Sequence, residues 1–326
     1  MGRACLHLGV LLVLAVWSGC AVRDLNGPTG QNGEPVPSGS GADWEKTAPL
    51  PEPTVRALVF SANKYLTAGG ESGRIYRSKN SGDAWQAVAA SNAAILSFAL
   101  DENGVLYAGS DGEGIFVSRF NGKSWETGTL VSGHVHALLV LPEGVLLAGL
   151  SNGLWQRGVS SAQWELVPLP TLGTRQIFSL LRSGVQILAG TDLGMFRSPD
   201  GQRWQSSGLD ELPVTALARS PAGWFFAGTA TNGIWRSADG ANWFPANEGL
   251  EASSVYALAV NSLNFVFAAT ENGVFYSGDL GQSWASFRDG LPEGRVLALV
   301  LDAQDKLYAA VEGAGVFRTV GNTRFR

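Results

Sequence analysis

The chain has 326 residues, with 28 acidic and 23 basic side chains, a formal net charge of −5 and 45% hydrophobic residues. Its 42 Gly and 14 Pro stay below the share of roughly 25–30% that marks disorder, so the apolar content predicts a folded core. The acidic balance and the lack of a Lys/Arg run exclude sequence-independent nucleic-acid binding, which needs clustered positive charge.

Residues 1–19 have the features of an export signal. Arg3 precedes an apolar stretch over residues 6–17, and small residues follow it. The stretch is shorter than the roughly 20 residues that a transmembrane helix needs. The Ser-Gly-Cys sequence at 18–20 resembles the lipobox of bacterial lipoproteins, which implies that Cys20 is lipidated and becomes the mature N-terminus. Ordinary secretion is the alternative.

Residues 20–43 predict a flexible tether. After Cys20 this stretch is rich in Gly, Pro and Ser and has almost no large apolar side chain, so burial cannot offset the entropy cost of ordering it. The predicted organisation is a signal peptide over 1–19, a tether over 20–43 and one folded domain over 44–326. The folded domain is then exported and lipid-anchored on the periplasmic or cell-surface side of a bacterial membrane.

Two markers recur with a period of about 40 residues over the whole folded domain. The first is an Ala-Gly or Ala-Ala pair that ends an apolar run, and its second residues are Gly69, Gly109, Gly149, Gly190, Gly228, Ala269 and Ala310. The second marker is a tryptophan, found at Trp85, Trp125, Trp164, Trp204, Trp243 and Trp284. A shared period of 20–50 residues indicates a repeat array or a propeller.

Each repeat contains four short β-rich runs separated by Gly, Asn and Asp turns. The first run is of the type Val-x-Ala-Leu at 55–58, the second ends in the Ala-Gly pair, and the fourth opens with the periodic Trp. The third opens with an apolar-aromatic pair such as Val274-Phe275. No segment keeps a helical period. The pattern predicts an all-β, seven-bladed β-propeller of four-stranded antiparallel blades.

The turn before the periodic Trp carries a known motif. Residues 277–284 (Ser-Gly-Asp-Leu-Gly-Gln-Ser-Trp) resemble the Asp-box, or BNR, repeat of sialidase-like propellers, S-x-D-x-G-x-x-W. The four copies in phase place these residues in the box: Ser78, Asn80, Trp85, Asp200, Trp204, Asp239, Trp243, Asp279 and Trp284. An Asp or Asn side chain can bond backbone amides across such a turn, and Gly supplies a positive φ. The resemblance implies a structural role away from any catalytic face.

The seventh repeat stops after its third run, at residues 316–319, and has no Trp strand. Trp44 lies 41 residues before Trp85, in phase with the repeat. Residues 44–48 therefore predict the outer strand of the last blade, which closes the ring and leaves no open edge.

A catalytic centre is not apparent. Sialidases carry an Arg-Ile-Pro motif, but here Arg74-Ile75 is followed by Tyr76, and all six tyrosines fall inside strand patterns. His134 and His136 would share one face of a strand, yet no third ligand is nearby, so we expect no metal and no cofactor. A pair of facing carboxylates of the glycosidase type stays open.

The face opposite the Asp boxes is the predicted binding surface, because its loops vary on a rigid scaffold. The residues expected around the mouth of the central channel are Arg56, His134, His136, Gln176, Tyr256 and Arg295, with Arg175 and Arg288 close by. The acids expected on the same face are Glu71, Asp111, Glu113, Asp192, Glu271 and Glu312. One position of the first run varies freely: Arg56, Leu96, His136, Phe178, Thr215, Tyr256 and Leu297. Such freedom predicts that it faces open space, where the basic side chains favour an acidic or polar group.

Among Asp-box proteins the chain is similar to exported, membrane-tethered propellers that act as assembly or scaffold factors, including the photosystem-assembly type. The resemblance implies a non-catalytic scaffold that binds a protein partner in the cell envelope. A carbohydrate-binding or sensor module and a glycosidase are the alternatives, because no motif identifies a partner.

Overall fold

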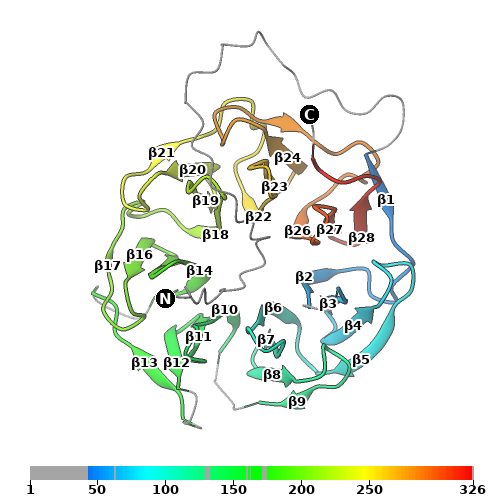
Figure 1. Ribbon diagram of the computed structural model, residues 1–326, viewed down its shortest axis with the longest axis horizontal. Coiled ribbons are helices and arrows are strands. Elements are labelled where there is room, and N and C mark those ends of the chain that lie inside the picture. Colours follow the sequence, from blue (N-terminus) through cyan, green and yellow to red (C-terminus); the bar gives the residue numbers. More distant parts are fainter. Residues whose placement is uncertain are drawn as a thin grey trace, which may run out of the picture.

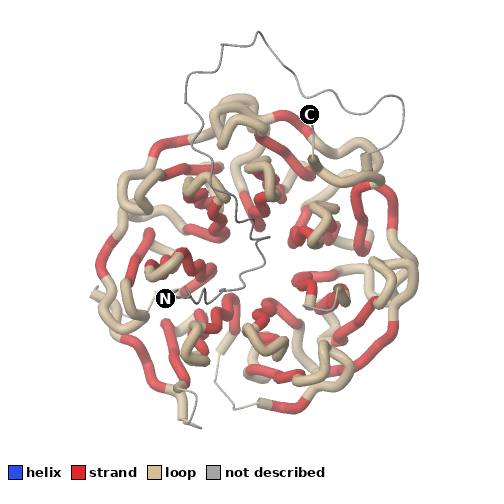
Figure 2. The backbone as a smooth tube through the Cα atoms, viewed as in Figure 1, coloured by secondary structure: helices blue, strands red, loops and turns tan. Residues whose placement is uncertain are grey.

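The computed structural model describes residues 43–61, 64–128, 133–158, 161, 163–170 and 175–324. These residues form seven four-stranded antiparallel sheets, arranged as blades around a ring (Figure 1). The described part contains strands and loops and no helix (Figure 2). The predicted all-β, seven-bladed propeller is therefore confirmed. The predicted signal peptide and Cys20 lie outside the described residues.

Every blade uses the same strand order from the centre to the rim, and consecutive strands pair as neighbours. The innermost strands are β2 (Val55–Phe60), β6 (Ile95–Leu100), β10 (Val135–Val140), β14 (Ile177–Ser183), β18 (Val214–Arg219), β22 (Val255–Val260) and β26 (Val296–Leu301). The second strands are β3 (Leu66–Gly70), β7 (Leu106–Ser110), β11 (Leu146–Leu150), β15 (Gln186–Thr191), β19 (Phe225–Thr229), β23 (Val266–Thr270) and β27 (Leu307–Val311).

In most blades the third strand is largely buried, whereas the outermost strand is the shortest and the most exposed. The third strands are β4 (Arg74–Ser78), β8 (Ile115–Ser118), β12 (Gly153–Arg157), β16 (Gly194–Ser198), β20 (Ile234–Ser237), β24 (Gly273–Ser277) and β28 (Gly315–Thr319). The outermost strands are β5 (Gln86–Ala90), β9 (Glu126–Thr127), β13 (Glu165–Val167), β17 (Gln205–Ser206), β21 (Phe244–Pro245), β25 (Ala285–Ser286) and β1 (Trp44–Lys46). The second strands, buried along most of their length, form the core of each blade.

The Ala-Gly marker and the opening Val or Ile of the first run meet at the junctions between blades. A methyl group on Gly69 would come within 2.5 Å of Ile95 Cγ2 in the next blade, and one on Gly228 would come within 2.5 Å of Val255 Cγ1. Real side chains do not approach so closely, so these positions need Gly to let neighbouring blades pack together. The Ala-Gly pair and the opening Val or Ile therefore repeat together, because they contact each other.

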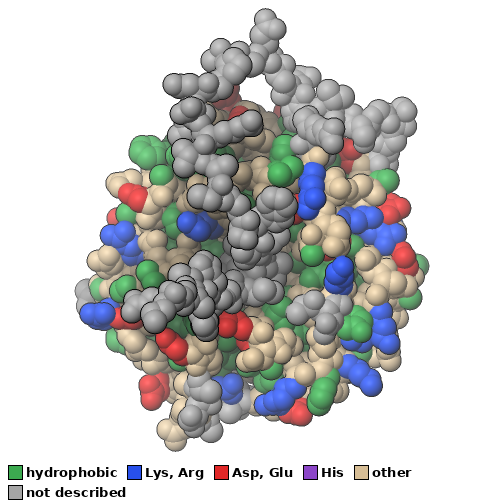
Figure 3. Space-filling model, in the orientation of Figure 1, with side chains coloured by type: hydrophobic (Ala, Val, Ile, Leu, Met, Phe, Trp, Pro, Cys, Tyr) green, Lys and Arg blue, Asp and Glu red, His purple; other side chains and the backbone are tan. Residues whose placement is uncertain are grey.

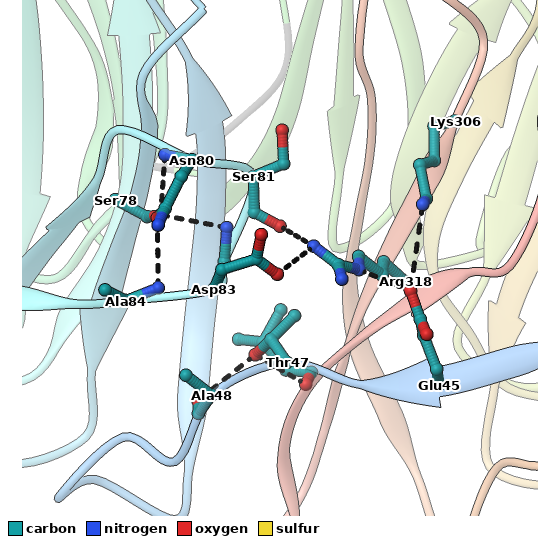
Figure 4. Close-up of polar contacts among 12 residues, drawn as sticks. Glu45, Thr47, Ala48, Ser78, Asn80, Ser81, Asp83, Ala84, Lys306 and Arg318 are labelled. Atoms are coloured by element: carbon teal, nitrogen blue, oxygen red, sulfur yellow. Dashed lines mark hydrogen bonds and ion pairs between the residues drawn. The ribbon is translucent and has the colours of Figure 1, made fainter.

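The ring closes as predicted. Strand β1 pairs with β28, so the N-terminal strand completes the blade formed by the last three strands of the chain. Arg318 of β28 bonds Glu45 of β1 at 2.7 Å and reaches Asp83 in the first blade, also at 2.7 Å (Figure 4). The same guanidinium donates to the Ser81 carbonyl at 2.9 Å, and thus ties the closing blade to its neighbour.

The contact between Arg318 and Ser81 recurs elsewhere in the ring. Arg77 donates to the Asn121 carbonyl at 2.7 Å, and Arg236 donates to the Leu280 carbonyl at 3.0 Å. Each acceptor lies in the next blade, in the eight-residue turn that ends at the periodic Trp (residues 78–85, 118–125 or 277–284). Each has a positive φ, between 52° and 61°. The arginine therefore bonds a backbone carbonyl that the tight turn exposes, and links adjacent blades at the Asp-box end.

Candidate binding site at the channel mouth

The freely varying position of the first run is a β-bulge in all seven blades. The register of each innermost strand against the second strand shifts at this residue, as between Val55 and Ala57 on β2. The seven bulge residues are Arg56, Leu96, His136, Phe178, Thr215, Tyr256 and Leu297. A bulge leaves one residue outside the ladder and redirects its side chain. Variation is tolerated here because the side chain has no fixed partner in the sheet.

A pocket of about 560 Å³ opens among the bulges of the first four blades. Its lining residues lie at the start of the innermost strands or just after the second strands: Arg56, Glu71, Ala94, Leu96, Asp111, His134, His136, Ser151 and Gln176. Four residues predicted from the sequence, Arg56, His134, His136 and Gln176, are thus brought together. We call this set of lining residues the mouth pocket.

Two ion pairs form opposite walls of the mouth pocket. Arg56 Nε donates to Glu71 Oε2, within the first blade. This bond is the main reason why the pKa of Arg56 is raised above its ordinary value. His134 contacts Asp111 through Nδ1 and Oδ1, and the two residues also form an isolated β-bridge between the third and second blades. The uncharged residues Ala94 and Leu96 of the second blade also line the pocket.

An aromatic row runs along the third and fourth blades. The His134 and His136 rings are stacked with centroids 6.0 Å apart, and the His136 ring lies 5.6 Å from that of Phe178. His136 is half-buried. Burial lowers the pKa of His136, the positive charge of His134 lowers it further, and Asp111 opposes both effects.

Tyr256 and Arg295, the other two predicted residues, lie at the same end of the propeller but do not line the mouth pocket. Arg295 forms a bidentate pair with Glu312, at 2.6 and 2.9 Å. This pair and a bond to Tyr256 raise the pKa of Arg295, and the charge of Arg295 also acts on Arg56. The residues therefore share one electrostatic environment.

The remaining acids of this face are used differently. Glu271 accepts the backbone amides of Ser253 and Ser254 at 2.8 and 2.9 Å, and Glu113 accepts the amide of Asn92 at 3.2 Å. Arg288 donates to the Asn272 carbonyl at 3.4 Å. On the face of the molecule seen in Figure 3, Lys and Arg side chains gather along the right side, and Asp and Glu side chains are scattered over the face.

The Asp-box side chains bond their own turns. Asp239 Oδ1 accepts the amides of Ala241 and Asn242 at 2.9 and 2.8 Å, and Asp200 and Asp279 accept equivalent amides. Asn80 Oδ1 accepts the Ala84 amide at 3.0 Å, and Ser78 Oγ accepts the Gly82 amide at 2.8 Å. Trp204 and Trp284 are buried, whereas Trp85 and Trp243 are half-buried.

Sequence reasoning did not anticipate the two walls of the mouth pocket. It placed Glu71 and Asp111 on this face but paired neither with Arg56 nor with His134. A usable signal exists, because the acid follows the second strand at the level where the innermost strand begins, and antiparallel pairing brings these positions together. Ser151 follows its second strand as Glu71 does, and Ala94 precedes its innermost strand as His134 does. The sequence analysis missed both residues because neither side chain is charged.

The chemistry available in the mouth pocket is recognition by hydrogen bonds and charge. Among the described residues, no group of three His, Cys, Asp or Glu side chains could hold a metal ion. Both carboxylates of the pocket are already engaged by a cation or an imidazole. In the part of the chain that the structure describes, no helix is long and apolar enough to cross a membrane.

No protein-family model matches the chain, and no curated protein does. Among solved structures, the extracellular domain of the one-component system BT4673 from B. thetaiotaomicron is 18% identical with a TM-score of 0.69, over 82% of this chain and 38% of that one. YCF48 bound to D1 peptide is 16% identical with a TM-score of 0.69, over 88% of this chain and all of that one.

The GH74 xyloglucanase from Xanthomonas campestris is 17% identical with a TM-score of 0.67, over 88% of this chain and 54% of that one. The chain thus spans about two fifths of the BT4673 domain and about half of the xyloglucanase. At these identities the similarity shows a shared propeller fold. The three neighbours have different functions, so the residues of this chain must carry the functional argument.

Proposed function

We propose that this protein is a non-catalytic, exported propeller, tethered to a bacterial membrane through Cys20, whose mouth pocket and neighbouring residues bind a protein partner in the cell envelope. The observation that carries the proposal is the ring of seven bulges. An otherwise strict repeat presents six different residue types at this position in seven blades, and three of the bulge residues, Arg56, Leu96 and His136, line a pocket large enough for a side chain of a partner.

The composition of the mouth supports protein recognition. Arg56, Gln176 and His136 offer hydrogen-bonding groups at one pocket, and Arg and aromatic residues are enriched at protein interfaces. YCF48, which this chain covers over its whole length, binds a peptide, and the BT4673 domain is extracellular. Both neighbours make a binding role outside the cytoplasm a reasonable use of this fold.

The alternative is a carbohydrate-binding module or a glycosidase, and one observation favours it. Glu71 and Asp111 line the same pocket, and a pair of carboxylates is what a glycosidase needs. However, Glu71 is engaged by Arg56 and Asp111 by His134, so neither is arranged as a free proton donor. Release of reducing ends from xyloglucan by the purified protein, lost in both Glu71→Gln and Asp111→Asn, would establish the alternative.

The binding proposal is tested by replacing Arg56 and Arg295 together with Ala. Partner recovery from detergent-solubilised envelope should be abolished, while the melting temperature stays nearly unchanged because both side chains are largely exposed. The matched control is Arg197→Ala with Arg203→Ala, two arginines near the Asp-box end. Undiminished recovery with the mouth variant would place the partner site elsewhere, and a collapsed melting temperature would show that these residues hold the fold.

The anchor is tested separately. Cys20→Ala should move the protein from the membrane to the soluble exported fraction, because the acyl chains would be lost. Cys5→Ala is the matched control and should leave the protein in the membrane fraction. Full retention of the Cys20 variant in membranes would refute lipid anchoring.

A further inference from the structure

The permanent charges at the mouth are already paired. Arg56 bonds Glu71, and Arg295 bonds Glu312. A ligand that approached either arginine would compete with a carboxylate held at hydrogen-bond distance. The arginines on which the expectation of an acidic ligand rested therefore do not offer free positive charge.

His136 is the exception among the ionisable residues of the mouth pocket. Its imidazole is half-buried between the rings of His134 and Phe178 and lines the pocket. No hydrogen bond joins its ring nitrogens to any residue that the structure describes. A half-buried imidazole that lines a cavity and has no hydrogen-bond partner among the described residues is a polar group that a ligand can satisfy.

The surroundings of His136 can be stated strand by strand. Strand β10, which carries His136, packs against β6, β7, β11 and β14. The ionisable residues of these four strands are Tyr107 and Arg182, and both lie toward the opposite strand ends. The ionisable residues that act on His136 are His134 and Asp111. The other ionisable residues of the same pocket are Arg56 and Glu71.

We propose that the mouth pocket binds an anionic group, a carboxylate or a phosphate, against His136, and that the imidazole takes up one proton as this group binds. The inference rests on the proposed function and names the chemistry of the partner group. The ligand supplies the counter-charge that His136 lacks, just as Glu71 and Asp111 supply it for Arg56 and His134.

The sign of the pocket charge supports this pH dependence. One arginine against two acids gives the lining a formal charge of −1 when the imidazoles are neutral, and protonation of His136 makes this charge less negative by one. The pocket therefore becomes more favourable to anions when His136 takes up a proton. A neutral ligand would not experience this change.

Linkage between proton uptake and anion binding sets the expected pH dependence of the affinity. Burial and the nearby His134 lower the pKa of His136, so the free imidazole is neutral at pH 7. An anion at hydrogen-bond distance favours the charged imidazole and raises this pKa. Affinity for the anion should then rise by at most about tenfold per pH unit as the pH falls between the bound and the free pKa, because one proton is taken up.

The test is an NMR titration of the imidazole C–H signals in the mature protein. The chain has three histidines, and His7 lies in the predicted signal peptide, so the mature protein shows only His134 and His136. The signals are assigned with His134→Gln and His136→Gln. The titration is run in chloride, in acetate and in inorganic phosphate at one ionic strength. A shift in acetate alone identifies a carboxylate, and a shift in phosphate alone identifies a phosphate.

In acetate or phosphate the pKa of His136 should rise relative to chloride, and it should rise more than that of His134. His136→Gln should bind either anion weakly and with a smaller pH dependence between pH 5 and 8 than the wild type shows in the same salt. Identical titration curves in all three salts would overturn the anion site. If the curves are identical while the Arg56 and Arg295 double variant still loses its partner, the anion site fails and the proposed function stands.

Discussion

The two ends of each blade follow opposite rules. At the Asp-box end the same residue types recur and bond the same backbone amides, as Asp239 and Asp279 do in their turns. At the mouth end the bulge position holds seven residues of six different types, and the side chains form pairs that do not repeat from blade to blade. In this propeller, repetition marks the contacts that hold the ring, and variation marks the surface available for recognition.

The two ends also differ in whether their side chains connect neighbouring blades or stay within one blade. Box side chains connect neighbouring blades: Trp284 donates to the Ala246 carbonyl at 2.8 Å, and Trp243 donates to the Ser207 carbonyl at 2.8 Å. By contrast, the Arg56 and Glu71 pair lies within one blade, and 39% and 46% of these side chains are exposed. Substitutions at the box end should therefore cost stability, whereas those at the mouth should cost binding.

Removal of the closing strand should have the largest effect. Deleting residues 44–48 removes β1 and with it Trp44, which is 2% exposed and donates to the Phe287 carbonyl at 3.0 Å. Loss of such a buried aromatic alone costs about 3–5 kcal/mol, and the edge of β28 would also be left unpaired. Thermal unfolding measures the loss, and deletion of residues 22–38 is the control. An unchanged melting temperature for the first variant would contradict closure by β1.

Trp284→Ala should cost about 3–5 kcal/mol, the usual range for a buried aromatic side chain. Trp284 is 5% exposed and lies in the same core cluster as Phe226 and Phe275. Phe244→Ala is the matched control, because this aromatic residue is 61% exposed and should change stability little. Urea unfolding compares the two variants. Equal effects would mean that the box tryptophan does not anchor its blade.

Arg318→Ala should cost about 1.5–3 kcal/mol, the range for hydrogen bonds to charged groups. The side chain is 17% exposed and bonds Glu45, Asp83 and a backbone carbonyl across the closing junction. Arg197 occupies the same position of β16, but the box of the next blade, residues 237–243, is one residue shorter than residues 78–85, so Arg197→Ala is the control and should cost less. If both variants unfold at the same urea concentration, the contact between blades adds nothing.

Asp279 should contribute about 1–2 kcal/mol through its turn bonds, and the contribution should depend on pH. Burial alone would raise the pKa of Asp279, but bonds from Ser283, Ser277 and Gln282 outweigh it and lower the pKa. A carboxylate whose folded-state pKa lies below the ordinary value of about 3.9 stabilises the fold fully above that value. The contribution is lost as the pH falls through the lowered pKa.

The stability difference between wild type and Asp279→Asn should accordingly be largest near neutral pH and shrink below about pH 4. The Asn variant is well matched, since Asn80 occupies the same place in the first box. A difference that grows on acidification would show that the carboxylate is not stabilised in the folded state.

The sequence predicted the propeller well because its constraints are periodic. The seven blades follow from the two 40-residue markers, and closure follows from the position of Trp44 relative to Trp85. The free variation at Arg56 and His136 also marked one position of the first run, and the structure has a bulge at this position.

The site was less predictable because it depends on where the bulges aim their side chains. A period of two along a strand does not encode a bulge, so the pairing of Arg56 with Glu71 could not be derived. The mouth pocket is also lined by Ala94 and Leu96, which carry no charge that could mark them as site residues in the sequence. Burial of each box tryptophan depends on the adjacent blade, which explains why Trp85 is less buried than Trp284.

The smallest effect on stability is expected at the mouth itself. Arg56→Gln breaks the pair with Glu71, but exposed pairs contribute only about 0–1 kcal/mol because water screens both charges. The bulge already holds Leu96 in the second blade and Thr215 in the fifth, so the backbone there accepts an uncharged side chain. Urea unfolding should therefore place Arg56→Gln within about 1 kcal/mol of wild type, below the loss for Arg318→Ala. A larger loss would mean that the mouth, like the Asp-box end, holds the ring together, and the contrast between the two ends would fail.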